Sequence, residues 1–239
     1  MKTKMIHNFC LAFLLLTGPC LPSFGTWSII VIDPKTKEIG IAGASCTVSV
    51  YGIGRIMPGK GAIVVQAMSN PFARLDGFRM IMNGDKPADI LAKLRQPNYH
   101  PEEQQYSIAC INDIDHPATY TGTKNTSHAG TLTGKGISVQ GNTLTNPDEI
   151  QAIFTAAIKA QKDGLPVQDI LMIALEAGAK AGGDKRCGER KASSAFLTVS
   201  KSYDVKEHWL NLVIYGTDDK VHAVDALRQK FDHWKTEKK

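Results

Sequence analysis

Thr26 is the residue with the clearest chemical potential, because the residues before it predict that export leaves it at a new N-terminus. An N-terminal threonine carries a hydroxyl nucleophile and an amine base on one residue. The α-amine has an ordinary pKa of about 7.7 to 8.0, so it can take the hydroxyl proton near neutral pH without a histidine. Spacing alone favours a simpler interpretation, in which Thr26 is only the first residue of a strand.

The first 25 residues follow the three-part plan of a secretory signal peptide. Lys2 and Lys4 give a positive start, and residues 9–16 form a short run without charge. Residues 23–25, Ser-Phe-Gly, then place small side chains at the minus-three and minus-one positions of a cleavage site. We therefore expect a signal peptide over residues 1–25, with cleavage after Gly25.

Two membrane-bound alternatives fit the leader less well. The apolar run is far shorter than the roughly 20 residues that a membrane-spanning helix needs. Pro19 directly before Cys20 disfavours a lipoprotein anchor at that cysteine. The expectation is a secreted or periplasmic protein with no stable membrane anchor, whose mature chain, residues 26–239, is one domain.

The composition of the chain limits which binding partners and cofactors are expected. Of the 239 residues, 43% are hydrophobic and 21% are charged, which is typical of a globular protein with a real core. The net charge of +5 falls to +3 when Lys2 and Lys4 are removed, and the remaining basic residues are scattered, so nucleic acid is not an expected partner. There is no phosphate-binding loop, and the histidines lack metal-ligand spacing, so no cofactor or metal is expected. The oligomeric state stays open.

Three cysteines remain after the leader, and two of them can pair in an oxidising compartment. Cys46 follows a strand-like segment and Cys187 lies in a polar loop, whereas Cys110 lies inside an apolar stretch. We predict a Cys46–Cys187 disulfide with Cys110 buried and free. A cysteine–histidine hydrolase that uses Cys46 or Cys187 is the alternative use of those sulfurs.

The mature chain reads as strands, then helices, then strands again, which favours an α+β fold with layered packing. The turn at Asp33-Pro34 separates two β-branched or small-residue segments and predicts an opening hairpin. The expected strands are residues 27–32, 38–44, 61–67, 106–111, 118–121, 195–199 and 209–215. The expected helices are residues 71–82, 88–94, a segment from 146 to about 158, 167–179 and 223–234.

Several sequence blocks, in order, resemble domain-of-unknown-function family 1028 (DUF1028) over about residues 26–227. They are Thr26-Trp27-Ser28-Ile29 through Asp33-Pro34, Gly40 to Ser45, Gly59-Lys60-Gly61-Ala62 with Gln66 and Asn70, Tyr120-Thr121-Gly122, Val139-Gln140-Gly141-Asn142, Ala177-Gly178, Gly182 to Arg186 and Ser193 to Phe196. The resemblance implies the N-terminal-nucleophile (Ntn) hydrolase superfamily and its four-layer αββα sandwich. It also places the predicted cleavage directly before the family's threonine.

The resemblance draws attention to Asn142, whose amide can donate a hydrogen bond to an oxyanion. The alternative is that Gly141 and Asn142 form a turn and simply permit unusual backbone angles.

Other candidate residues are charged or hydroxylated. Asp184 and Arg186 can form a charge pair beside the threonine amine and tune its pKa, or a structural salt bridge that holds their loop. Ser45 ends the second strand, where it can meet Thr26 across the hairpin. Arg55 is a further candidate cation.

The resulting hypothesis is a secreted Ntn hydrolase that cleaves an amide bond in a small molecule or peptide, with Thr26 as nucleophile. The alternative is a secreted, non-catalytic interaction or cell-surface-associated module on the same fold. The two differ at the N-terminus, since catalysis demands a free Thr26 and binding does not.

Overall fold

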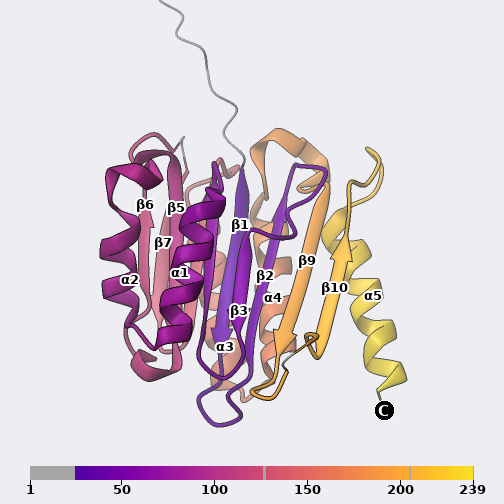
Figure 1. The fold of residues 1–239 in the computed structure, drawn as a ribbon. Coiled ribbons are helices and arrows are strands. Elements are labelled where there is room, and N and C mark those ends of the chain that lie inside the picture. Colours follow the sequence, from indigo (N-terminus) through magenta and orange to yellow (C-terminus); the bar gives the residue numbers. More distant parts are fainter. Residues whose placement is uncertain (1–24, 126–127, 205, 239) are drawn as a thin grey trace, which may run out of the picture.

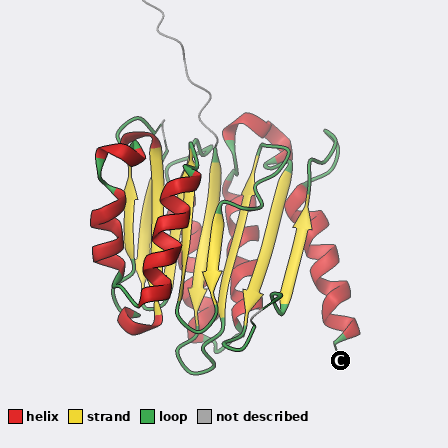
Figure 2. Cartoon of the chain, viewed as in Figure 1, coloured by secondary structure: helices red, strands yellow, loops and turns green. Residues whose placement is uncertain are grey.

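The computed structural model describes residues 25–125, 128–204 and 206–238. Apart from Gly25, the predicted signal peptide lies outside these ranges. Within them the chain forms ten strands in two antiparallel sheets and five α-helices, a mixed α+β fold (Figures 1 and 2). The strands are β1 (Thr26–Ile32), β2 (Ile39–Ser45), β3 (Gly54–Met57), β4 (Gly61–Ala67), β5 (Gln104–Cys110), β6 (Ala118–Thr121), β7 (Gly130–Gly134), β8 (Ile137–Asn142), β9 (Ser194–Ser200) and β10 (Leu210–Ile214). The helices are α1 (Pro71–Asn83), α2 (Pro87–Leu94), α3 (Glu149–Lys162), α4 (Val167–Ala181) and α5 (Ala223–Glu237).

The two sheets pack face to face between two helical layers. One sheet has the order β10-β9-β2-β1-β8-β7 and the other β3-β4-β5-β6. Helices α1 and α2 cover the four-stranded sheet, whereas α3, α4 and α5 pack against the six-stranded one (Figure 1). A third apolar cluster fills the space between the sheets. The central strands are therefore covered on both faces.

Strand periodicity decides which side of β1 each residue faces, because successive side chains point to opposite faces. Trp27, Ile29 and Val31 join the cluster under α3 and α4, whereas Ile30 and Ile32 join the cluster between the sheets. By the same alternation, Thr26 and Ser28 face the second sheet. The nucleophile candidate thus lies between the sheets, at the end of the sandwich where β1 begins.

Trp27 anchors this end of β1 to α4. Its indole Nε1 donates to the backbone oxygen of Leu175 at 3.2 Å, and the side chain is fully buried. Gly178 makes the approach possible, since a Cβ there would lie 2.5 Å from that nitrogen. This contact gives a packing reason for the Ala177-Gly178 block.

Each helix and strand expected from the sequence is present, with small shifts at its ends. Three strands were missed. They are β3, at one edge of the four-stranded sheet, and β8 and β7, which are the last two strands at one edge of the six-stranded sheet. In the described part of the chain, no helix is long and apolar enough to cross a membrane.

Candidate functional site

Thr26 is the first residue of β1 and lies between two strands that bring other candidates to it. It pairs with Ser45 of β2 on one side and with Asn142 of β8 on the other. The predicted meeting of Thr26 and Ser45 across the hairpin is confirmed. Both serine and threonine are nearly buried, at 1% and 3% exposure.

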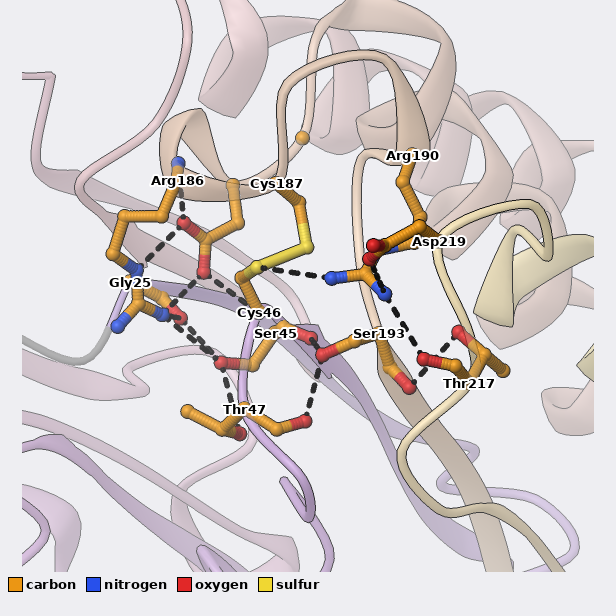
Figure 3. The surroundings of a disulfide bond; sticks show 12 residues. Gly25, Ser45, Cys46, Thr47, Arg186, Cys187, Arg190, Ser193, Thr217 and Asp219 are labelled. Atoms are coloured by element: carbon orange, nitrogen blue, oxygen red, sulfur yellow. Dashed lines mark hydrogen bonds and ion pairs between the residues drawn. A yellow bond between two sulfur atoms is a disulfide. The ribbon is translucent and has the colours of Figure 1, made fainter.

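The carbonyl oxygen of Gly25 is the point at which three donors converge. It accepts hydrogen bonds from Ser45 Oγ at 2.5 Å and Arg186 Nη2 at 2.9 Å (Figure 3). It also accepts one from Thr26 Oγ1 at 2.6 Å. The Thr26 hydroxyl is thus engaged by the peptide group that precedes it. Removal of Gly25 would take away the acceptor that these three groups share.

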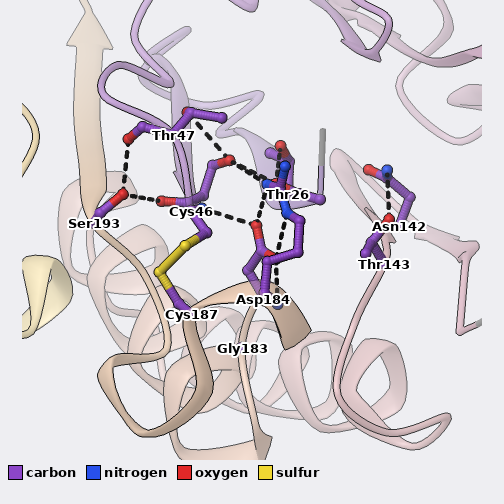
Figure 4. A network of polar contacts seen from close by, with 12 residues as sticks. Thr26, Cys46, Thr47, Asn142, Thr143, Gly183, Asp184, Cys187 and Ser193 are labelled. Carbon is purple, nitrogen blue, oxygen red and sulfur yellow. Dashed lines mark hydrogen bonds and ion pairs between the residues drawn. A yellow bond between two sulfur atoms is a disulfide. The ribbon is translucent and has the colours of Figure 1, made fainter. Parts of the chain in front are cut away.

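Asp184 is fully buried and forms an ion pair with Arg186. The guanidinium binds both carboxylate oxygens, with Nε 2.9 Å from Oδ1 and Nη2 2.5 Å from Oδ2. The backbone N–H of Cys46 donates to Oδ2 at 2.8 Å (Figure 4). The backbone N–H of Arg186 donates to Oδ1 at 3.1 Å. The sequence left open whether this pair holds its loop or lies beside the threonine. The pair lies beside the threonine, because the guanidinium also reaches the Gly25 carbonyl. Its effect on the pKa of the amine stays a prediction.

Asp184 also lies directly against Gly25. A Cβ at Gly25 would be 2.7 Å from Asp184 Oδ1, closer than real side chains approach. A residue larger than glycine therefore cannot precede Thr26 without displacing the carboxylate.

The predicted Cys46–Cys187 disulfide is present and fixes this pair to the sheet. It joins the residue after β2 to the 3-10 helix Lys185–Arg190, with a Cα–Cα distance of 5.4 Å (Figure 3). The bond closes a sequence separation of 141 residues. Cys110 is free and buried, also as predicted. The alternative that made Cys46 or Cys187 a catalytic thiol is wrong, since both sulfurs are bonded.

Replacing both disulfide cysteines by serine should lower the free energy of unfolding by about 3–5 kcal/mol. The chain-entropy treatment gives roughly 5 kcal/mol for so long a loop, from which native strain subtracts. Urea denaturation of the Cys46→Ser/Cys187→Ser protein measures the loss, and Cys110→Ala is the control that keeps the bond. An unchanged unfolding midpoint would show that the bond does not constrain the unfolded chain.

Asn142 and Gln66 place two side-chain amide groups next to Thr26. Gln66 of β4 reaches across from the second sheet, and its Nε2 lies 3.1 Å from the backbone oxygen of Thr26 and 3.3 Å from Asn142 Oδ1. Asn142 is fully buried and its Nδ2 donates to Thr143 Oγ1 at 3.4 Å. The turn interpretation of Gly141 and Asn142 is wrong, because both belong to β8. The residue with a left-handed backbone is Thr143, with φ 55°.

Glu149 is a buried carboxyl group beneath the Asp184 loop. It is fully buried, and neither of its oxygens forms a hydrogen bond within the described residues. Burial is the main cause that raises its pKa to about 8, and the nearby charge of Asp184 adds to the rise. The backbone N–H groups of Gly183 and Thr145 lie near the carboxyl and oppose the rise, as does the charge of Lys191, but both N–H groups donate to other backbone oxygens.

Glu149→Gln should therefore reduce the pH dependence of stability. Between pH 4.5 and 8 the folded protein keeps the Glu149 proton that the unfolded chain loses, so wild-type stability falls as pH rises through this window. The loss is on the order of 3–5 kcal/mol. Unfolding free energies at pH 5, 6.5 and 8 measure the slope, and the exposed neighbour Asp148→Asn is the control. Equal slopes for Glu149→Gln and wild type would contradict this assignment.

A cavity of about 360 Å³ opens beside Thr26. Thr26, Ser45 and Gln66 belong to its wall, together with residues of the 47–53 segment and the 67–69 segment. Its volume is in the range of small-molecule sites. Arg55, the other candidate cation, does not line this cavity and lies over the Phe78 ring, 5.7 Å from its centroid. Within the described residues, no cluster of His, Cys, Asp and Glu is arranged to hold a metal ion.

Comparison with known proteins shows which family the chain belongs to. The model of DUF1028, described as a family of unknown function, matches residues 26–224. The chain belongs to the DUF1028 family. A crystal structure of a protein from Silicibacter pomeroyi, also assigned to DUF1028, is similar with a TM-score of 0.74 and 23% sequence identity, over 87% of this chain and 85% of that one. No curated protein matches the chain.

The DUF1028 match begins at Thr26, the residue that the predicted cleavage would expose. Gln66 was visible in the sequence only as part of a family block, without a role. Its position in β4, facing the other sheet, now explains it. Gln66 also accepts from Ser28 Oγ at 2.6 Å and donates to Gln105 Oε1 at 2.9 Å. Arg74, which lines the same cavity, carried no signal in the sequence at all.

Proposed function

We propose that this DUF1028 protein is an exported Ntn hydrolase that cleaves an amide bond with Thr26, once residues 1–25 have been removed. The helix–sheet–sheet–helix layering agrees with the arrangement that the resemblance to Ntn hydrolases implies. The leader and the disulfide agree with a secreted or periplasmic location.

The observation that carries the proposal is the convergence of donors on the peptide group before Thr26. Ser45 and the cationic Arg186 both donate to the Gly25 carbonyl oxygen, beside the Thr26 hydroxyl and next to the cavity. After cleavage these donors are in position for the carbonyl oxygen of another amide. Fixed donors at that oxygen stabilise the negative charge that develops when a nucleophile attacks the carbonyl carbon.

The reaction then needs only the chain's own groups and water. The Thr26 amine takes the hydroxyl proton as Oγ1 bonds to the amide carbon, and the carbonyl oxygen becomes an oxyanion. Ser45 and Arg186 are the proposed donors to that oxyanion, and Asn142, on the other side of Thr26, is a further one. Collapse breaks the C–N bond, and the leaving amine receives the proton from the Thr26 ammonium. Water then hydrolyses the threonine ester, which releases the acid and restores the hydroxyl.

The buried state of Thr26 makes processing part of the function. While Gly25 is attached, the nitrogen of Thr26 is an amide and cannot act as a base, and the hydroxyl is bound to the Gly25 oxygen. Asp184 and Arg186 lie against that peptide bond and would flank the freed amine. We infer that the unprocessed chain is inactive.

The experiment that tests the proposal begins with the exported protein. Its N-terminal sequence should start Thr-Trp-Ser, and a β-lactone probe should acylate it once, at Thr26, as located by peptide mapping. A mature N-terminus elsewhere, or a free Thr26 that the probe does not acylate, would contradict the proposal. It would favour the interaction module instead.

A further inference from the structure

Arg74 introduces a charged side chain into the wall of the cavity beside Thr26. The wall combines hydroxyl and amide groups around Thr26 with an apolar portion formed by Val50, Tyr51, Ile53 and Met68. Among the described residues that line it, Arg74 has the one charged side chain. A ligand that fills the cavity therefore meets an apolar surface and the charged side chain of Arg74, on a different element from the Thr26 amine.

The charge of Arg74 has no carboxylate counterion in the part of the chain that the structure describes. Its Nη1 donates to Ser69 Oγ at 3.0 Å and lies 3.5 Å from the backbone oxygen of Ser69, both neutral acceptors. Burial, and secondly the charge of Arg55, lower its pKa. Arg79, one turn further along α1, shows the usual situation, with its guanidinium 3.3 Å from Asp76 Oδ1. A half-buried guanidinium among neutral groups keeps donors available for an anion.

The backbone around Arg74 is held in an unusual conformation. Ala67 and Ser69, which both line the cavity, have φ values of 67° and 50°, a region that few non-glycine residues adopt. Ser69 Oγ also donates to the backbone oxygen of Val65 at 2.9 Å, and Asn70 caps α1 through the N–H groups of Phe72 and Ala73. Such conformations persist where the surroundings over-determine them, and they are common at binding sites. Arg74 is thus presented on a fixed segment.

We propose that the cavity beside Thr26 selects amides that carry an apolar group and a carboxylate, and that Arg74 binds the carboxylate. N-acyl amino acids and short peptides with a free C-terminal carboxylate belong to this class. The guanidinium fork matches a carboxylate with two parallel hydrogen bonds, and the apolar wall takes the neighbouring side chain or acyl group. This inference rests on the proposed function, because it names the substrates of that site.

Binding to the mature Thr26→Ala protein tests the inference without depending on turnover. The probes are N-acetyl-phenylalanine and its N-methylamide, which differ in the carboxylate, measured by calorimetric titration at pH 7.5. The acid should bind at least about tenfold more tightly than the methylamide. Arg74→Gln should abolish this preference, Arg74→Lys should keep part of it, and Arg79→Gln, a matched exposed arginine of α1, should keep all of it.

The outcomes separate this inference from the hydrolase proposal. Equal affinity for the two probes, no binding of either at millimolar concentration, or an Arg74→Gln protein that keeps the preference would overturn the role of Arg74, whatever Thr26 does. A preference that disappears with Arg74→Gln supports the carboxylate site even if the mature protein never hydrolyses an amide. Melting temperatures of the two Arg74 variants show whether any loss of binding reflects unfolding. Arg74→Lys keeps the charge and therefore separates the loss of charge from the loss of the guanidinium.

Discussion

Thr26→Ala is expected to reduce the turnover of a cleavable amide by the mature protein at least about a thousandfold, because the substitution removes the attacking oxygen. Thr26→Ser should retain measurable turnover, since its hydroxyl and amine both survive. The fold should persist in both. Among the described residues, the Thr26 hydroxyl donates to the Gly25 carbonyl, which the mature chain lacks, so the stability change should be within about 1 kcal/mol.

Adding one glycine before Thr26 gives the most diagnostic variant. The hydroxyl remains, but the amine moves away by one residue, so activity should fall nearly as far as in Thr26→Ala. Thr47→Ala is the matched control, because Thr47 lines the same cavity and its hydroxyl is 3.3 Å from Ser45 Oγ. That control should change the rate less than about tenfold. Full activity of the glycine-extended protein would overturn the N-terminal-nucleophile mechanism.

Much of the fold could be predicted from the sequence because most strands and helices have a recognisable local sequence pattern. The opening hairpin is separated by a proline turn, and helices such as α3 and α4 have apolar residues at helical spacing. β7 and β3 were missed because both are short and include or begin with glycine. β8 was missed for a different reason, since its Gln-Gly-Asn end was interpreted as a motif or a turn. Gly141 is needed there for packing, as a Cβ would lie 2.7 Å from Leu144 Cδ1.

The residues of the candidate site also fall into those that a local pattern predicts and those that it does not. Residues adjacent to recognisable features, such as Asp184 in its glycine-rich loop or Ser45 at a strand end, could be predicted. Gln66 contacts residues of the other sheet, and Arg74 lines a cavity together with residues far from it in the sequence. No local pattern records that a glutamine will reach the other sheet, or that an arginine will lie among neutral groups. These contacts depend on how the two sheets and α1 pack together.

Asp184→Asn is expected to reduce both stability and activity. The carboxylate is fully buried and accepts hydrogen bonds from the Cys46 and Arg186 backbones as well as from the Arg186 guanidinium. An asparagine loses the charge and turns one acceptor into a donor that faces other donors. Removing one partner of a buried pair costs several kcal/mol, and we expect about 3 kcal/mol in urea denaturation. Glu176→Gln removes a more exposed pair of similar geometry, with Arg228 Nε 2.6 Å from Glu176 Oε1, and should cost about 1 kcal/mol or less.

A pH profile distinguishes a role in chemistry from a role in holding the loop. A negative charge beside an amine favours the ammonium form and a positive charge disfavours it. The rate at which a β-lactone probe acylates Thr26 should rise with pH as the amine loses its proton, and this rise is the acidic limb of the profile. Asp184→Asn should therefore move the acidic limb to lower pH, and Arg186→Gln should move it to higher pH. Glu176→Gln should leave the limb in place. If Asp184 and Arg186 only brace the loop, their variants will lower the acylation rate at every pH without moving the limb. Opposite displacements of the acidic limb in the two variants, in contrast, require both charges to lie beside the Thr26 amine.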